Sequence, residues 1–296
     1  MADLKKAIED FEEGRLNDAE KQLKSLMSEQ VENPDIYYYL GQIAFQKDQF
    51  DAAIDYAEKA IGLNERQAAY HELLGQALGL KAQQAGAIKG AMLLRKVKSA
   101  FQTALELDPK SLRAREGLFM IFLFTPPIAG GDINKAMELL EEIKTQNRAH
   151  GHLAQAMIHL KNNELKAAEQ EFEKAIETDD HDREILMRTG RFFLQRKNVH
   201  KARQIADLYI KNFPEDPRGY LLLGEAYLDD EQLEQALEWI NLAIEKDELF
   251  FNAHLQRIKA MLKNGRKAEA QKDADFVLNH PEAGESVKNQ VKKMIQ

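Results

Sequence analysis

The residues that most often carry catalysis and metal binding are scarce in this 296-residue sequence. It contains no cysteine, which excludes disulfides, thiol nucleophiles and thiolate metal sites. Serine occurs at only five positions, and none of these lies in the Gly-x-Ser-x-Gly turn that presents a hydrolase nucleophile. We therefore predict no catalytic residue, no cofactor and no metal ion, and we expect that the protein is not an enzyme.

Long apolar runs are also missing. The longest, from Leu118 to Phe124, is much shorter than the roughly 20 residues that a transmembrane helix needs. Met1 leads directly into a charged segment, so we expect a soluble, cytoplasmic protein, or a periplasmic one if Met1 replaces a removed export signal. The net charge of −8 argues against broad binding to nucleic acids, which requires clustered Lys and Arg.

The sequence does contain a small residue that recurs in one register. The successive gaps are 34, 44, 39, 32, 34, 34 and 34 residues, and the two longest indicate insertions. A period near 34 is typical of a helix-turn-helix unit copied along the chain, in which small residues lie where two helices pack closely. The residues in this register are Ala19, Ala53, Val97, Ala136, Ala168, Ala202, Ala236 and Ala270.

The regular units near the C-terminus show a family motif. In the seventh unit its residues occur in order at Leu223-Gly224, Tyr227, Ala236 and Ala243. The chain thus resembles the tetratricopeptide repeat family over nearly its whole length. The resemblance implies an all-α fold: a right-handed α-solenoid of about eight helix-turn-helix units with a C-terminal capping helix.

We expect a single solenoid domain over residues 1–296. A polar helix over residues 284–296 would cap it, because the terminal repeat of a solenoid otherwise leaves an apolar face in water. The register places the repeats at approximately 1–33, 34–67, 68–111, 112–148, 149–182, 183–216, 217–250 and 251–282.

Repeats three and four depart from the regular length. About ten extra residues around Leu80 to Gly90 form either a lengthened helical arm that adds contact surface or a longer loop packed on the next repeat. A basic amphipathic helix on a membrane surface is a third, less favoured interpretation, because the positive charges are few. About five extra residues lie between Thr125 and Asp132, and we expect Asp132 to cap the following helix rather than to help bind an anion.

These two departures resemble a subset of bacterial tetratricopeptide repeat proteins. That subset has a long third repeat and a Pro-x-x-x-Gly-Gly loop in the fourth. The matching segments here are Arg95-Lys96-Val97 and Pro126 to Gly131.

In this family the first helices of the repeats line the concave surface, so the resemblance implies a groove that binds a protein or peptide. Met and aromatic side chains suit adaptable apolar anchors, although the alternative is that many of them belong to the interhelix core. Arg188 and Arg191 would add a local positive charge. The inner strip also includes Glu116, Leu153, Leu221, Glu225, Leu255 and Lys259. Its predicted binding residues are Tyr38, Gln42, Phe45, Glu72, Gln76, Leu80, Met120, Phe124, Met157, Met187, Arg188 and Arg191.

Three histidines, His71, His152 and His254, occupy the same slot of their repeats. A shared packing role explains all three at once. In repeat five His150, His152 and His159 cluster, but His152 and His159 are seven residues apart, whereas a metal pair on one helix requires histidines at positions i and i+4. We therefore interpret them as structural.

Together these features predict a non-enzymatic scaffold or adaptor that binds a peptide or helical segment of another protein in its groove. An alternative is a structural scaffold that self-assembles through its terminal repeats or the repeat-three insertion. We expect a protein partner, no nucleic acid and no membrane span, and a homo-oligomer is possible.

Overall fold

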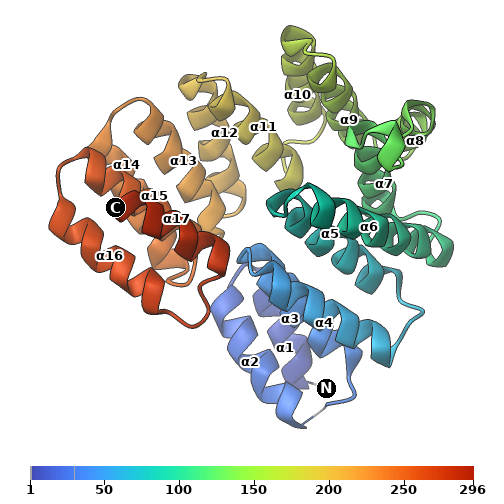
Figure 1. The fold of residues 1–296 in the computed structure, drawn as a ribbon, viewed down its shortest axis with the longest axis horizontal. Coiled ribbons are helices and arrows are strands. Elements are labelled where there is room, and N and C mark those ends of the chain that lie inside the picture. The colour runs from blue at the N-terminus through green and yellow to red at the C-terminus, as the bar shows by residue number, and fades with distance from the viewer. Residues whose placement is uncertain (1, 30) are drawn as a thin grey trace. The chain divides into compact units, whose positions relative to one another are not determined.

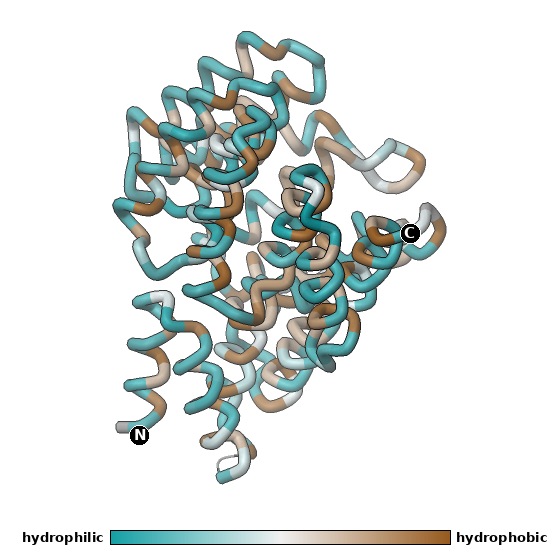
Figure 2. Tube along the Cα trace, turned by 90° about the vertical axis from the view of Figure 1, so that its left-hand side faces the viewer, coloured by the Kyte–Doolittle hydropathy of each residue, from teal (hydrophilic) through white to brown (hydrophobic). Residues whose placement is uncertain are grey.

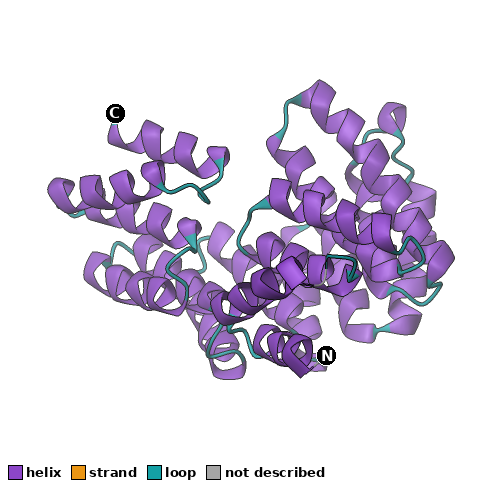
Figure 3. Ribbon diagram, turned by 90° about the horizontal axis from the view of Figure 1, so that it is seen from below, coloured by secondary structure: helices purple, strands orange, loops and turns teal. Residues whose placement is uncertain are grey.

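The computed structural model describes residues 2–29 and 31–296, and none of these residues forms a strand (Figure 3). Each predicted repeat holds two helices, and successive helices form antiparallel hairpins (Figure 1). The predicted all-α fold of helix-turn-helix units is confirmed. The helices are α1 (Ala2–Glu12), α2 (Leu16–Glu29), α3 (Pro34–Gln46), α4 (Phe50–Leu63), α5 (Ala68–Gln84), α6 (Ala87–Leu107), α7 (Leu112–Phe124), α8 (Ile133–Gln146), α9 (Arg148–Lys161), α10 (Leu165–Thr178), α11 (Arg183–Gln195), α12 (Val199–Asn212), α13 (Pro217–Asp229), α14 (Leu233–Lys246), α15 (Phe251–Lys263), α16 (Lys267–Asn279) and α17 (Glu285–Ile295).

Local sequence explains where many of these helices begin. The side chains of Asn33, Asp182 and Asp216 accept hydrogen bonds from backbone amides in the first turns of α3, α11 and α13. Such caps satisfy amides that have no partner inside the helix. Hydrophilic and hydrophobic residues alternate along the helices with helical spacing (Figure 2), so most helices bury one face and leave another in water.

The recurring small residues lie where paired helices approach most closely. The seven alanines of the register are completely buried, and Val97 is 2% exposed. A Cβ atom added to Gly224 would lie 2.6 Å from Ile240 Cγ1, and one added to Gly190 would lie 2.4 Å from Leu222 Cδ2. This confirms that the glycines of the first helices are there for packing, since a larger residue would collide with the neighbouring helix.

A left-handed residue ends the first helix in six of the eight repeats, as far as the described residues show. The amide that follows it bonds to the carbonyl five residues earlier, as Gln49 N does to Ala44 O at 2.9 Å. This is the Schellman arrangement that closes many helices. In these six turns the residues with positive φ are Gly14, Asp48, Asn163, Lys197, Glu231 and Gly265.

The slot that holds His71 and His254 ties the first helix to the turn before it. His71 Nε2 and His254 Nε2 each lie 2.9 Å from the carbonyl oxygen six residues upstream. The hydroxyls of Tyr37 and Tyr220 donate to the equivalent carbonyls at 3.0 and 2.9 Å. A structural role for His71 and His254 is therefore confirmed, while His152 instead places its Nδ1 2.6 Å from Glu171 Oε2.

The insertion in repeat three lengthens both of its helices. Helix α5 has 17 residues and α6 has 21, whereas α3 and α4 have 13 and 14. The extra residues are thus helical, as the arm interpretation predicted, and the loop interpretation is wrong; the added contact surface stays a prediction. In repeat four a short 3-10 turn, Pro127–Ala129, precedes Asp132, whose side chain accepts from the amides of Asn134 and Lys135, so the predicted N-cap is also confirmed.

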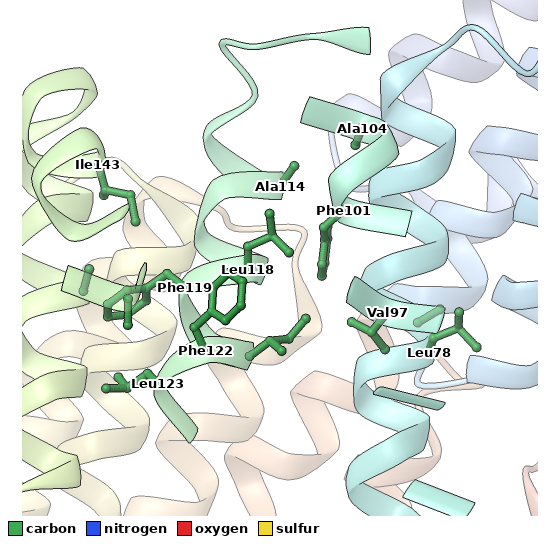
Figure 4. Close-up of a cluster of buried hydrophobic side chains, with 14 of the residues drawn as sticks. Leu78, Val97, Phe101, Ala104, Ala114, Leu118, Phe119, Phe122, Leu123 and Ile143 are labelled. Carbon is green, nitrogen blue, oxygen red and sulfur yellow. The ribbon is translucent and has the colours of Figure 1, made fainter. Parts of the chain in front are cut away.

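The chain divides into two compact units. One comprises the residues up to Ile8 and Ala19–Asp179, and the other comprises Glu9–Asp18 and Asp180–Gln296. Phe101, Phe119 and Phe122 lie in the core of the first unit, between α5, α6, α7 and α8 (Figure 4). In the second unit the fully buried Val291 packs α17 against the last repeat, as expected of a cap. The single solenoid over residues 1–296 stays a prediction.

Candidate functional site on the first helices

The first helices of consecutive repeats contact one another within each unit. In the first unit α3 contacts α5, α5 contacts α7 and α7 contacts α9; in the second, α11 contacts α13 and α13 contacts α15. Equivalent side chains on these helices therefore follow one another along each unit. We call the predicted binding residues on α3, α5, α7 and α9 the first-helix surface.

The predicted binding residues keep part of their surface exposed. Eleven of the twelve are half-buried, and Phe124 is 46% exposed. The prediction of the inner strip was wrong at four positions that belong to the packed interior. Glu116, Leu153, Leu221 and Leu255 are each at most 7% exposed.

Three of the predicted residues pack on the core and also keep part of their surface exposed. Phe45, Met120 and Met157 pack against the core of the first unit while remaining half-buried. Their inner atoms stabilise the helix stack and their outer atoms are available to a ligand. Methionine suits such a double role because its flexible thioether adapts to irregular partners.

Aromatic and amide groups gather at the α3 end of this surface. Gln42 Nε2 donates to the Tyr38 hydroxyl at 3.0 Å, and the Tyr38 and Tyr70 rings lie 5.3 Å apart. The Tyr70 hydroxyl donates to Asp35 Oδ1 at 2.6 Å. Burial raises the pKa of both tyrosines, and for Tyr70 the Asp35 carboxylate raises it further, so both hydroxyls stay protonated and can donate hydrogen bonds.

Further along the surface, the polar side chains of α5 differ in how many hydrogen bonds they make. Glu72 accepts a hydrogen bond from the Ser111 hydroxyl and lies 4.0 Å from the Arg113 guanidinium. The amide of Gln76 makes no side-chain hydrogen bond with any described residue, although it is half-buried. A primary amide offers both a donor and an acceptor, which matches the needs of a peptide backbone.

The predicted residues of the second unit form ion pairs with their neighbours. Arg191 bonds to Glu225, which holds the equivalent position of the next repeat, and Arg188 Nη2 lies 2.5 Å from Glu184 Oε1. Burial raises the pKa of Glu225, and Arg191 opposes that shift only in part. The positive charge expected at Arg188 and Arg191 is thus balanced by carboxylates.

Two of the three histidines of repeat five border an open depression of about 390 Å³. His152 and His159 line it together with Lys144, Arg148 and Glu171. His150, in contrast, is buried and places its Nδ1 2.7 Å from Glu116 Oε1. Within the part of the chain that the structure describes, no three His, Asp or Glu side chains are grouped to hold a metal ion.

None of the described helices combines the length and the apolar character that crossing a lipid bilayer requires.

Comparison with known families identifies the repeat. Tetratricopeptide repeat models match residues 10–77, 153–217 and 209–249. The chain belongs to the tetratricopeptide repeat family. No protein of curated function matches the sequence.

Solved structures of tetratricopeptide repeat proteins share the fold. A thermophilic example from Thermus thermophilus has 17% identity and a TM-score of 0.54, and the match covers 65% of this chain and 98% of the other. Human IFIT1, solved as a dimer with m7Gppp-AAAA, has 15% identity and a TM-score of 0.54, with 97% and 69% covered. At these identities the likeness establishes the fold alone.

The sequence indicates turns at Lys47-Asp48 and Asn264-Gly265 of this tetratricopeptide repeat protein, but sequence reasoning missed the left-handed conformation of the turn residues and the buried Glu116–His150 pair. The turn residues Asn163, Lys197, Glu231 and Gly265 are spaced by 34, so the period itself could have located them. The conformation of Lys197 and Glu231 was hidden because Lys and Glu are poor indicators of positive φ. The Glu116–His150 pair had no signal, because it depends on which faces of two helices meet.

Proposed function

We propose that this tetratricopeptide repeat protein is a non-enzymatic scaffold that binds a peptide or helical segment of another protein on its first-helix surface. Tetratricopeptide repeats generally mediate protein–protein interaction and generally lack catalytic activity of their own. Repeats that stack in this way offer extended surfaces rather than enclosed pockets.

The observation that supports the proposal most strongly is the mixed exposure along α3, α5, α7 and α9. Met120 and Met157 present apolar atoms that are only half-buried, and Gln76 presents an amide whose hydrogen bonds are unused. Apolar anchors beside a few unused polar groups are what an extended or helical segment needs for affinity and orientation.

The test begins with affinity capture and mass spectrometry to obtain a partner, followed by binding measurements with purified proteins. Met157→Glu places a charge among the apolar anchors, and Gln76→Arg replaces the unused amide. We expect each variant to weaken partner binding by at least about tenfold, as loss of an interface anchor does.

Gln170→Glu is the matched control, because Gln170 is exposed on the second helix α10. It should bind as the wild type does, and circular dichroism should show that all three variants stay folded. Unchanged binding by both first-helix variants would reject this surface.

A further inference from the structure

The two irregular repeats place their extra residues at the same end of their helix pairs. Helix α6 begins ten residues before Val97, whereas α8 begins three residues before Ala136, the equivalent position of the next repeat. The first turns of α6 therefore correspond in register to the loop between α7 and α8. Figure 4 agrees, because α6 and α7 run in opposite directions with Val97 and Phe122 toward the same end. Lys98 Nζ lies 4.8 Å from the centre of the Phe122 ring, which joins α6 to the end of α7.

Apolar side chains in these two segments face water. Ile128 is 99% exposed in the loop, and Ile88 is 83% exposed on α6. Of the eight large hydrophobic side chains exposed among the described residues, all except Val31 lie between Ile88 and Met137. A concentration of this kind usually marks an interaction surface. We call Ile88, Met92, Ile128, Ile133 and Met137, with the cations Lys89, Arg95 and Lys96, the edge surface.

The loop that carries Ile128 is held in place by its own backbone. Gly130 N donates to Pro127 O at 3.0 Å and Gly131 N donates to Pro126 O at 3.1 Å. A Cβ atom on Gly131 would lie 1.7 Å from Thr125 O, so only glycine fits there. Asp132 N then donates to Phe122 O at 3.0 Å, which fastens the loop to α7. The exposure of Ile128 is thus a property of a defined turn. An apolar side chain held in this way can pack into an apolar pocket of a partner protein.

The charge on the α6 part of the edge surface has one sign. Residues 73–105 contain five Lys or Arg and no Asp or Glu, in a chain whose net charge is −8. Lys89, Arg95 and Lys96 are exposed, and none of the three forms an ion pair with a described residue. Carboxylates on a partner would complement these cations and fix its position beside the apolar anchors.

We propose that the edge surface docks an acidic amphipathic segment of a partner protein, with apolar side chains that meet Ile88, Met92 and Ile128 and carboxylates that meet Arg95 and Lys96. The proposal rests on the proposed scaffold function but uses a different face, since α6 and α8 are second helices. A protein segment fits better than an anionic membrane. Basic clusters that hold proteins to membranes contain roughly four to eight cations, whereas the edge surface has three, Lys89, Arg95 and Lys96.

Selection of short random peptides by display tests the proposal with the full-length protein. Binders are selected on the wild type and counter-selected on the Met92→Ser, Ile128→Ser double variant. We expect the enriched peptides to be rich in Asp and Glu, with apolar residues at helical spacing. Their affinity should fall at least about tenfold both in the double variant and in an Arg95→Glu, Lys96→Glu variant, and it should fall with added salt.

Val31→Ser is the matched control, because Val31 is 54% exposed outside the edge surface. It should bind the peptides as the wild type does. NMR spectra of ¹³C-labelled methionine methyl groups separate this proposal from the first-helix proposal. The peptides should shift the resonances of Met92 and Met137 and leave those of Met120 and Met157 in place.

Three results would overturn the proposal. The first is that the enriched peptides lack an excess of acidic residues or bind the double variant equally well. The second is that vesicles of equal parts phosphatidylglycerol and phosphatidylcholine sediment the wild type but not the double variant, which would assign the surface to a membrane. The third is that the wild type self-associates and the double variant does not, which would assign it to a second copy of the chain.

Discussion

Gly224 shows how single residues set the spacing of helices in this protein. A Cβ atom there would lie 2.6 Å from Ile240 Cγ1 and 3.2 Å from both Ala236 O and Ile240 N. Two of these neighbours are backbone atoms, which cannot rotate away as the end of a side chain can. The sequence predicted a close helix contact at Gly224, because glycine destabilises a helix and its presence there requires a packing reason.

Replacing Gly224 with alanine should destabilise the protein by about 1–3 kcal/mol, the usual cost of overpacking. Gly62→Ala is the control, since nothing lies within 4 Å of a Cβ at that helical position. This control should gain up to about 1 kcal/mol from helix propensity. Urea unfolding followed by circular dichroism measures both, and a stabilising Gly224→Ala would contradict the packing assignment.

Asp216 is a buried carboxylate with several partners in the second unit. Its carboxylate accepts from the Tyr209 hydroxyl at 2.7 Å and from Arg218 Nε at 2.8 Å, and its side chain is 5% exposed. Burial alone would raise the pKa of this carboxyl, but Arg218 and Arg183 outweigh burial and hold the pKa below its usual value. Tyr209 therefore stays protonated, because burial and the Asp216 charge raise its pKa.

Asp216→Asn should lower the free energy of unfolding by about 2–4 kcal/mol near pH 7, since it removes the charge that pairs with Arg218. A carboxyl whose pKa is lowered by folding stabilises the protein above its unfolded pKa of about 4 and loses that contribution as pH falls below it. The difference between variant and wild type should therefore shrink from pH 4 toward about pH 2. Denaturant titrations across this range measure it, and a constant difference would contradict the assignment.

At the scale of helices and turns, the sequence predicted where repeats three and four change length but not what the extra residues form. The segment around Lys81 to Ala85 is rich in Ala and Gln, which suit a helix, while Gly86 and Gly90 suit a break. The chain in fact breaks only at Ala85 and Gly86, between α5 and α6, because packing of the two helices extends both of them. The helix propensities of single residues do not include this stabilisation by packing between helices.

The turn between α13 and α14 offers a direct test of the recurring turn geometry. Glu231 has φ of 58° there, and equivalent turns use Gly14 and Gly265. A left-handed conformation costs an L-residue roughly 1–2 kcal/mol, while glycine adds some entropy to the unfolded chain. Glu231→Gly should therefore raise stability by roughly 0.5–1 kcal/mol.

Thermal unfolding compares Glu231→Gly with Glu231→Ala, which removes the carboxylate but keeps the strained backbone. The alanine variant should be no more stable than the wild type. Equal stabilisation by both variants would point to the lost charge instead of the backbone.

At the scale of the whole molecule, the sequence period of about 34 residues predicted the fold and the order of the repeats. It did not predict the division at Asp179 and Asp180, because the spacing on either side of it stays regular. Nor could it tell Met157, which is half-buried, from the fully buried Leu153 one turn earlier. Both residues suit a helix interface, and only the angle at which neighbouring helices meet decides which is exposed.

The methionine methyl groups test the central claim most directly, because two of them lie on the first-helix surface. The measurement is a titration of ¹³C-methyl-labelled protein with its captured partner, followed by NMR. The account predicts that the Met120 and Met157 resonances shift in proportion to the bound fraction, and that Met157→Glu abolishes the titration. A partner that binds stoichiometrically while both resonances stay unchanged would contradict it.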